Sequence, residues 1–275
     1  MLYHFKIKPM YKIVFYISIL VSCFLMSCVS NVEKGEEAFE NEDYEEALEF
    51  FKAANKLDPN SYYILYNIAR CNEELGDFKA AIPFYSKSIK LNPKFLEGFL
   101  GRARCNMKME KYESVIVDTD NILALDESNF DANSMKGKCS FKLMQFMDAT
   151  HYFNEALKKN PDHLSTYYHR GVARASFGDQ YGALKDLNFF INEKKDFAHA
   201  YYNRGVILEQ IGNFPLAVSD YSKAIGLNLK NWEIYYKRGV CNFQSKNKKA
   251  ACQDFKNLAK YDKKLSADAL KEYCL

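Results

Sequence analysis

The sequence predicts an all-α fold built from seven consecutive helical hairpins of 34 residues each. Pro59, Pro93 and Pro161 are 34 and 68 residues apart, and a fixed period of this length is typical of helical repeat arrays. One position of the period holds only Gly or Ala, and a second holds Ala in six units and Val115 in the third. Only 12 glycines and 6 prolines occur in 275 residues, which argues against an all-β chain with many tight turns.

The composition indicates a folded core and argues against a nucleic-acid partner. Apolar residues make up 48% and aromatic residues 15% of the chain, which is ample for a hydrophobic core. The formal charge is +3, but Lys6, Lys8 and Lys12 lie in the first 27 residues, which contain no acid. Without that segment the net charge is near zero, whereas a nucleic-acid binder normally carries a net basic surface.

The first 27 residues are predicted to be a signal peptide. Residues 13–26 read IVFYISILVSCFLM, with lysines before them and no charge among them. As a helix this stretch spans roughly 21 Å, which is short of the ~30 Å hydrocarbon core of a membrane. Basic flanks and this length suit a secretory signal better than a permanent span. Translation could start at Met1 or at Met10, and both starts keep the segment.

The end of the apolar stretch, Leu25-Met26-Ser27-Cys28, resembles a bacterial lipobox. The resemblance implies cleavage before Cys28 and acylation of Cys28, with enough acyl chains for stable anchoring where one chain is marginal. The alternatives are an uncleaved signal anchor, or a plain secretory signal in which Cys28 is incidental. The residue after Cys28 is Val29 and not the aspartate that is linked to inner-membrane retention in some bacteria, which favours the outer membrane of a bacterial envelope. The sequence does not indicate which face of that membrane carries the chain.

Counting from Cys28 divides the chain into seven units and a C-terminal segment, residues 266–275, which is expected to cap the array. The units are 28–61, 62–95, 96–129, 130–163, 164–197, 198–231 and 232–265. Position 8 of the units is Gly35, Ala69, Ala103, Gly137, Gly171, Gly205 and Gly239. Position 20 is the Ala or Val site noted above, and position 24 is Phe, Tyr or Leu in six of the seven units.

Together these positions resemble the tetratricopeptide repeat signature. The resemblance implies two antiparallel helices per unit, A and B, stacked into a right-handed α-α superhelix, a solenoid whose concave groove is lined by the A helices. A small residue at position 8 lets helix A approach helix B closely. Gly76, Gly178 and Gly212 at position 15 are expected to end helix A in a left-handed conformation, and Pro83 to kink its helix mildly.

Positions 7 and 23 vary together across the units. Four units have Arg at position 7 and Asp at position 23, and the other three lack both residue types. We therefore expect a structural ion pair between helix A and helix B of those four hairpins. The pairs are Arg102–Asp118, Arg170–Asp186, Arg204–Asp220 and Arg238–Asp254, and the other units combine Lys34, Ile68 and Lys136 with Phe50, Phe84 and Tyr152.

The cysteines and histidines do not indicate catalysis or metal binding. Position 10 is cysteine in four units, where a small core residue is expected: Cys71, Cys105, Cys139 and Cys241. Cys241 with Cys252, on facing helices, is the one candidate disulfide. His169 and His199 are expected to be exposed polar residues of the groove. The sequence has no HExxH, CxxC, phosphate loop or Ser-His-Asp order, so neither an enzyme nor a cofactor is expected.

In tetratricopeptide proteins positions 2, 5, 6, 9, 12 and 13 of helix A face the groove. Apart from Glu33, Glu36 and Glu40 in the first unit, they supply Tyr63, Tyr66, Asn67, Arg70, Arg104, Lys108, Lys138, Lys142, Tyr168, His169, His199, Tyr202, Asn203, Tyr236 and Lys237. A basic middle flanked by tyrosines and asparagines suits an extended acidic or aromatic segment of another protein. The two-carboxylate clamp of chaperone-tail binders is absent, because the units before Asn67 and Asn203 lack its Lys and Asn.

Charge is polarised along the chain. Residues 31–60 contain ten acids and three bases, and residues 232–275 contain ten bases and five acids. Such a dipole could orient docking or favour head-to-tail association. The sequence thus predicts a non-enzymatic scaffold, tethered by lipid at Cys28, that binds other proteins. The alternatives are an accessory subunit of an envelope enzyme or assembly machine, and an envelope protein that binds glycans or peptides.

Overall fold

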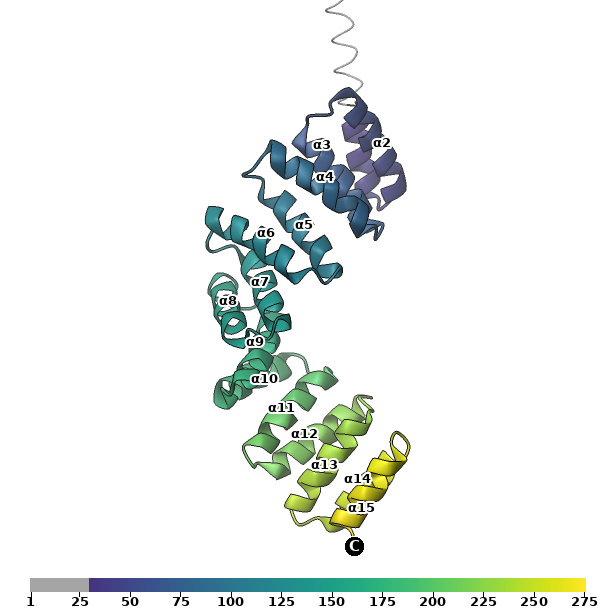
Figure 1. Ribbon diagram of the computed structural model, residues 1–275, viewed down its shortest axis with the longest axis vertical. Helices are drawn as coiled ribbons and strands as arrows, with labels where there is room; N and C mark the ends of the chain where they lie inside the picture. Colours follow the sequence, from purple (N-terminus) through teal and green to yellow (C-terminus); the bar gives the residue numbers. More distant parts are fainter. Residues whose placement is uncertain (1–29) are drawn as a thin grey trace, which may run out of the picture. The chain divides into compact units, whose positions relative to one another are not determined.

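The computed structural model describes residues 30–275, which form helices joined by short turns and no strand (Figure 1). Residues 30–40 are helical. They are followed by α2 (Tyr44–Leu57), α3 (Tyr62–Glu74), α4 (Phe78–Leu91), α5 (Leu96–Lys108), α6 (Tyr112–Leu125), α7 (Phe130–Lys142), α8 (Phe146–Lys159), α9 (Leu164–Phe177), α10 (Gln180–Glu193), α11 (Ala198–Gln210), α12 (Phe214–Gly226), α13 (Trp232–Gln244), α14 (Lys248–Leu258) and α15 (Lys263–Tyr273).

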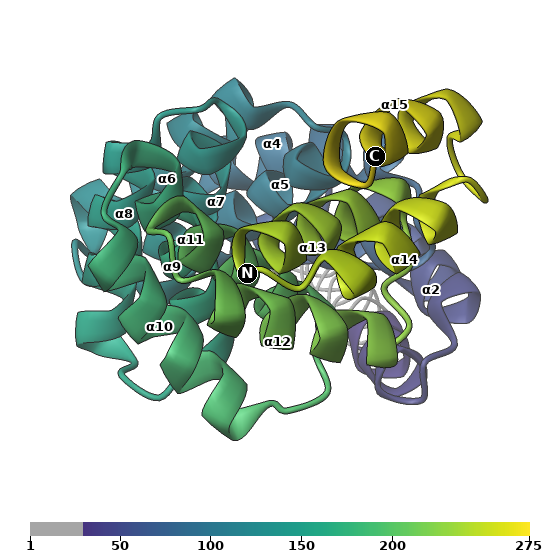
Figure 2. The ribbon, with the colours of Figure 1, turned by 90° about the horizontal axis from the view of Figure 1, so that it is seen from below.

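The chain divides into two compact units between Glu127 and Ser128. The described part of unit 1 holds helix 30–40 and α2 to α6, and unit 2 holds α7 to α15. In both units each helix packs against the next one, as α13, α14 and α15 of unit 2 do in Figure 2. The predicted signal peptide and Cys28 lie outside the described residues. No helix among residues 30–275 has the length and apolar character needed to cross a membrane.

The helices keep the period of the sequence. From α3 to α13 every odd-numbered helix begins 34 residues after the previous one, and so does every even-numbered helix from α2 to α14. Helix 30–40 and the odd-numbered helices from α3 to α13 are therefore the A helices, and the even-numbered helices from α2 to α14 are the B helices. The predicted all-α array of helical hairpins is confirmed. The last helix, α15, begins at Lys263 and not at residue 266, because Asp262 caps it by accepting a hydrogen bond from the Leu265 amide at 2.9 Å.

One backbone conformation ends every A helix. Position 15 has a positive φ in all seven hairpins, as predicted for Gly76, Gly178 and Gly212 with φ of 79°, 97° and 77°. The other four hairpins place side-chain-bearing residues in this left-handed region: Glu42, Glu110, Met144 and Lys246. A residue in the left-handed conformation lets the last carbonyl groups of the helix accept hydrogen bonds. A residue other than glycine adopts this conformation at a cost of about 1 kcal/mol.

Small residues at position 8 are required by rings at position 24. A Cβ atom on Gly205 would lie 2.9 Å from Cε1 of Tyr221, and one on Gly239 would lie 2.5 Å from Cε1 of Phe255. Both rings are completely buried. Each ring thus fills the space that the missing side chain of helix A leaves open, which allows the two helices of a hairpin to pack closely.

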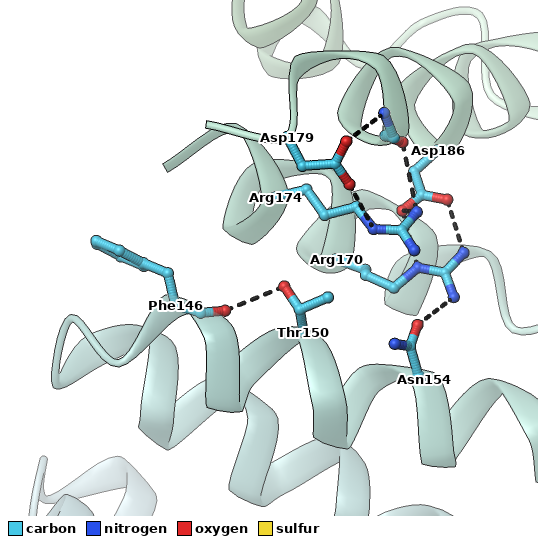
Figure 3. A network of polar contacts seen from close by, with 8 residues as sticks. Phe146, Thr150, Asn154, Arg170, Arg174, Asp179 and Asp186 are labelled. Carbon is cyan, nitrogen blue, oxygen red and sulfur yellow. Dashed lines mark hydrogen bonds and ion pairs between the residues drawn. The ribbon is translucent and has the colours of Figure 1, made fainter. Parts of the chain in front are cut away.

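All four expected ion pairs between positions 7 and 23 are present, and each arginine also reaches the preceding hairpin. Arg170 donates from Nε and Nη2 to Asp186 at 2.8 and 2.7 Å, and from Nη1 to Asn154 at 2.8 Å. Figure 3 shows Arg170 between Asn154 of α8 and Asp186 of α10. Position 25 of the preceding hairpin supplies a second acceptor residue each time: Ser86 for Arg102, Asn154 for Arg170, Asn188 for Arg204 and Ser222 for Arg238. The arginine therefore joins three helices, and its role goes beyond the single hairpin expected from the sequence.

The hairpins without this ion pair use other chemistry at the same two positions. The Lys34 ammonium lies 5.8 Å from the centre of the Phe50 ring, and that of Lys136 lies 4.3 Å from the Tyr152 ring. These are cation–π contacts. Ile68 and Phe84 instead belong to one apolar cluster. Each combination avoids leaving a charge unpaired between the helices.

The candidate disulfide between Cys241 and Cys252 does not form. Cys252 is bonded to Cys274 at the end of α15, whereas Cys241 is completely buried against Tyr221 and Ala217 of the preceding B helix. A position-10 side chain points toward the previous hairpin and therefore away from Cys252. As expected, the four position-10 cysteines are buried, and burial raises the pKa of Cys241 to about 12.

Candidate functional site

The candidate site is the surface that the A helices form in each unit. In unit 1 it comprises helix 30–40, α3 and α5, and in unit 2 it comprises α7, α9, α11 and α13. We call these the helix-A surfaces. Most of the side chains predicted for the groove already have partners within the protein, and those partners decide what each surface can bind.

In unit 1 the first two A helices are joined by polar contacts. The Tyr63 hydroxyl donates to Glu36 at 2.6 Å, which raises the pKa of Tyr63. Asn67 is only 1% exposed, donates to the Tyr63 carbonyl and accepts from Arg70. The Arg70 guanidinium lies 4.0 Å from the centre of the Phe39 ring. The expectation that Asn67 presents its amide to the groove is therefore wrong, because its neighbours on α3 use both ends of that amide.

A glutamate neutralises the predicted basic residue of α5. Arg104 donates from Nε and Nη2 to the two carboxylate oxygens of Glu73 at 2.6 and 2.9 Å. The buried Tyr85 hydroxyl donates to the same carboxylate. Burial and this carboxylate raise the pKa of Tyr85. Lys108 on the same helix is exposed, and Tyr66 packs edge-on against Phe95 with ring centres 4.8 Å apart.

In unit 2 an aromatic cluster holds one polar group in place. The Tyr168 ring packs against Phe190 and Phe197, each with ring centres 5.2 Å apart. The amide of Asn203 donates to the Tyr168 hydroxyl at 3.0 Å. Both Tyr168 and Asn203 are half-buried. Asn203 is thus fixed by a contact between two A helices and keeps its carbonyl oxygen as an acceptor group at this surface.

The two histidines of unit 2 differ in their surroundings. His169 is half-buried, and its ring stacks on Phe153 with centres 6.0 Å apart. Burial, followed by the nearby charges of Lys138 and His163, lowers the pKa of His169 to about 4. His169 is therefore neutral near pH 7 and less exposed than expected, whereas His199 is exposed. Lys138 is half-buried and Lys142 is exposed, both on α7.

The C-terminal part of this surface repeats the glutamate arrangement of unit 1. Glu209 accepts from the buried Tyr221 hydroxyl at 2.6 Å and lies 3.5 Å from the Lys237 ammonium. Burial, followed by a hydrogen bond with Glu233, raises the pKa of the half-buried Tyr202. Tyr236 is half-buried beside Phe255. Lys237 is therefore partly neutralised, whereas Lys138 and Lys142, the other predicted groove lysines of unit 2, form no ion pair within residues 30–275.

The sequence contains a signal for these glutamates that the groove positions alone do not reveal. Glu occupies position 12 only in the two hairpins that have Tyr at position 24, which are Glu73 with Tyr85 and Glu209 with Tyr221. The hairpins with Phe at position 24 have Phe at position 12 as well: Phe39 with Phe51, Phe141 with Phe153 and Phe243 with Phe255. A tyrosine hydroxyl that is buried needs an acceptor, and the glutamate supplies it.

Open hollows lie between hairpins, around the Arg–Asp pairs. One of ≈ 460 Å³ surrounds Arg204 and Asp220, and one of ≈ 370 Å³ surrounds Arg102 and Asp118. These polar groups already bond to one another, so neither hollow holds a free reactive pair. Among residues 30–275, no three His, Cys, Asp or Glu side chains come close enough together to hold a metal ion.

Antiparallel helical hairpins with a 34-residue period, small residues at position 8 and polar A-helix surfaces define a repeat protein of the interaction-scaffold class. Two segments, residues 32–94 and 198–231, match family models described as tetratricopeptide repeat. These two segments are tetratricopeptide repeats, and the other hairpins of residues 30–275 keep the same 34-residue period. A comparison with curated proteins found no match.

Solved structures of the family share the fold. A tetratricopeptide repeat protein from Parabacteroides merdae is 21% identical with a TM-score of 0.64, over 90% of this chain and 98% of that one. The C-terminal part of a repeat protein from Cytophaga hutchinsonii is 19% identical with a TM-score of 0.70, over 87% and 99%. YrrB, described as a tetratricopeptide protein with an unusual peptide-binding site, is 22% identical with a TM-score of 0.59, over 64% and 91%.

Proposed function

We propose that the chain is a lipid-anchored adaptor of a bacterial envelope, which binds an extended segment of a partner protein on the helix-A surface of unit 2. The observation that carries the proposal is a set of half-buried polar side chains on this surface, of which neighbouring hairpins hold Tyr168, Asn203 and Lys237 in place. Fixed side chains lose little conformational freedom on binding, which favours recognition by a preorganised surface.

The chemistry of this surface favours a segment that is acidic at one end and aromatic further along. Lys138 and Lys142 attract carboxylates near α7. The rings of Tyr168 and Tyr202 offer faces for aromatic or apolar side chains, and the Asn203 carbonyl accepts from a backbone amide of the segment. The description of YrrB as a peptide-binding tetratricopeptide protein supports this use of the fold.

Charge reversal on α7 tests the binding site. Crosslinking followed by pull-down from native membranes should recover a protein partner with the wild-type chain. Lys138→Glu with Lys142→Glu should weaken that recovery by roughly tenfold or more, since each reversal replaces attraction with repulsion. Lys256→Glu with Lys260→Glu is the matched control, because these exposed lysines belong to α14 and its end. A partner that both variants retain equally, or recovery of a small molecule alone, contradicts the proposal.

Substitution at the lipobox tests the tether separately. Cys28→Ala should abolish palmitate labelling and move the chain out of the membrane fraction, because acyl chains on Cys28 provide the anchoring. Cys23→Ala, in the same apolar stretch, should change neither result. Labelling that persists in the Cys28→Ala chain would show that the lipid is absent from Cys28 or attached elsewhere.

A further inference from the structure

A row of exposed apolar side chains follows the turns between helices A and B in unit 2. Large apolar residues at positions 14, 15, 18 and 19 of three consecutive hairpins are 40% to 81% exposed. They are Met144, Met147, Phe177, Tyr181, Ile211 and Leu216. We call these six residues the apolar edge. Polar or glycine residues are usual in such turns, so this composition is unexpected for a surface that faces only water.

The six residues lie along a single edge of unit 2. Consecutive helices joined by short turns run antiparallel, so connections alternate between two edges of a hairpin stack. The turns after α7, α9 and α11 therefore share one edge, and α8 packs on α9 just as α10 packs on α11. Six large side chains exposed to this extent amount to an apolar area of several hundred Å², at the size where such patches mark protein or membrane contacts.

The shape of the edge favours a soft partner over a rigid one. Met144, Met147 and Tyr181 are 75%, 73% and 81% exposed, so these side chains project from the turns and do not line a hollow. A protein partner would need a matching pocket for each of them, whereas a lipid interface adapts to apolar side chains that enter it.

The charges beside the apolar edge are mainly positive. The next turn on the same edge, after α13, carries three exposed lysines, Lys246, Lys248 and Lys249. Lys271 lies at the same end, because the disulfide from Cys252 to Cys274 holds the end of α15 beside the first half of α14.

The acidic residues of this edge are fewer. Asp148 and Glu272 are exposed there, and Asp179 faces Arg174 at 3.5 Å. The corresponding turns of unit 1 contain acids instead, such as Glu42 and Glu110. Lysines next to exposed apolar and aromatic side chains are the combination that binds anionic membrane surfaces.

We propose that the apolar edge and the adjoining lysines of unit 2 form a reversible contact with an anionic lipid surface. Charge argues against a second copy as the occupant, since in a self-complementary contact the lysines would meet an edge that has few acidic residues. The contact does not depend on the tether proposed at Cys28. Where both exist, the tether raises the effective concentration of the lipid surface for unit 2.

Tryptophan fluorescence in vesicles of phosphatidylcholine and phosphatidylglycerol tests the contact with the full chain. The single tryptophan, Trp232, begins α13 on the opposite edge of unit 2. The variant Trp232→Phe with Tyr181→Trp moves this probe to the apolar edge, and we call its indole the edge probe. Lipids brominated in their acyl chains should quench the edge probe several-fold and leave Trp232 of the wild-type chain unquenched. Emission from the edge probe should also shift to shorter wavelength.

Lysine substitutions test the electrostatic part. Lys246→Gln, Lys248→Gln and Lys249→Gln together should lower the membrane partition of the edge by roughly 100-fold, since one lysine near an anionic surface contributes roughly fivefold. The matched control changes three exposed lysines near the opposite end of the last hairpin to glutamine. These are Lys256, Lys260 and Lys264.

Three results would overturn the proposal. The first is an edge probe that stays unquenched in chains that float with the vesicles, and the second is equal quenching without phosphatidylglycerol. The third is dimerisation in the absence of lipid that increases with protein concentration and buries the edge probe. This result would show that a second copy of the chain covers the apolar edge. Adding Cys28→Ala to the probe variant should leave the quenching in place, so a failed tether leaves this test intact. Far-ultraviolet circular dichroism verifies that each variant is folded.

Discussion

Replacing Arg204 by isoleucine should be among the most destabilising changes in unit 2. Arg204 donates to Asp220 twice and to Asn188 once, each time at 2.7 Å. Asp220 is 4% exposed, so the substitution leaves a buried carboxylate without its cation. Removing one partner of a buried pair costs about 3–5 kcal/mol. Because Arg204 keeps some exposure, we expect a loss near the middle of this range, about 4 kcal/mol.

The double variant Arg204→Ile with Asp220→Phe should be more stable than Arg204→Ile alone. It recreates the combination that Ile68 and Phe84 form in α3 and α4, where no charge lies between the helices. Removing both partners of a buried pair costs far less than removing one. We expect a total loss of about 2 kcal/mol and a coupling energy of at least about 2 kcal/mol in a double-mutant cycle.

Urea unfolding followed by circular dichroism measures this cycle, provided that the slope of the free energy against urea stays constant among variants. The comparison pair is Lys52 and Glu49, which are 2.9 Å apart on the exposed face of α2. Such exposed pairs contribute little, so this cycle should show no measurable coupling. If Arg204 and Asp220 couple no more strongly than this pair, the reasoning about buried charge at positions 7 and 23 is refuted.

Three further predictions concern other features of the fold. Gly205→Ala should cost about 1–3 kcal/mol in urea unfolding because its Cβ meets a buried ring, whereas Gly226→Ala, with nothing within 4 Å, should be neutral or stabilising; equal effects would contradict the packing argument. Cys252→Ser with Cys274→Ser should loosen α15 by about 3 kcal/mol, since the bond closes a loop with a separation of 22 residues; unchanged hydrogen exchange in α15 would count against this. The pKa of His169 is lowered from 6.5 to about 4, so the unfolded chain binds its proton first and stability falls as pH drops from 6.5 toward 4, by at most about 3 kcal/mol. His169→Phe should remove this slope, and a slope that persists would assign it to other groups.

The repeat pattern explains why much of the fold was predictable. Because the chain contains seven similar hairpins, each position of the repeat can be compared seven times within the one sequence. This comparison revealed the small residue at position 8 and the joint variation of positions 7 and 23. The four Arg–Asp pairs are present at 2.6 to 2.7 Å. The sequence also pairs glutamate at position 12 with tyrosine at position 24. The reason for this pairing became clear only when the structure showed that the tyrosine hydroxyl is buried and needs an acceptor.

The candidate site was less predictable, because exposure depends on neighbours. Helix periodicity placed Asn67, Arg104 and Lys237 on the groove side of their helices. Whether these groups can bind anything depends on side chains of the same turn or of the preceding hairpin. The side-chain oxygen of Asn67 accepts a hydrogen bond from Arg70. Glu73 neutralises Arg104, and Glu209 partly neutralises Lys237.

The sequence by itself determined the hairpin period, the close approach at position 8 and the pairing of positions 7 and 23. These follow from local helix geometry and from patterns that repeat every 34 residues. Only the tertiary structure decided the second acceptor of each arginine, the partner of Cys252 and the row of exposed apolar turns in unit 2. These features depend on contacts between side chains of adjacent hairpins or helices. The sequence of a single repeat does not contain both partners of such a contact, and only packing between helices brings the partners together.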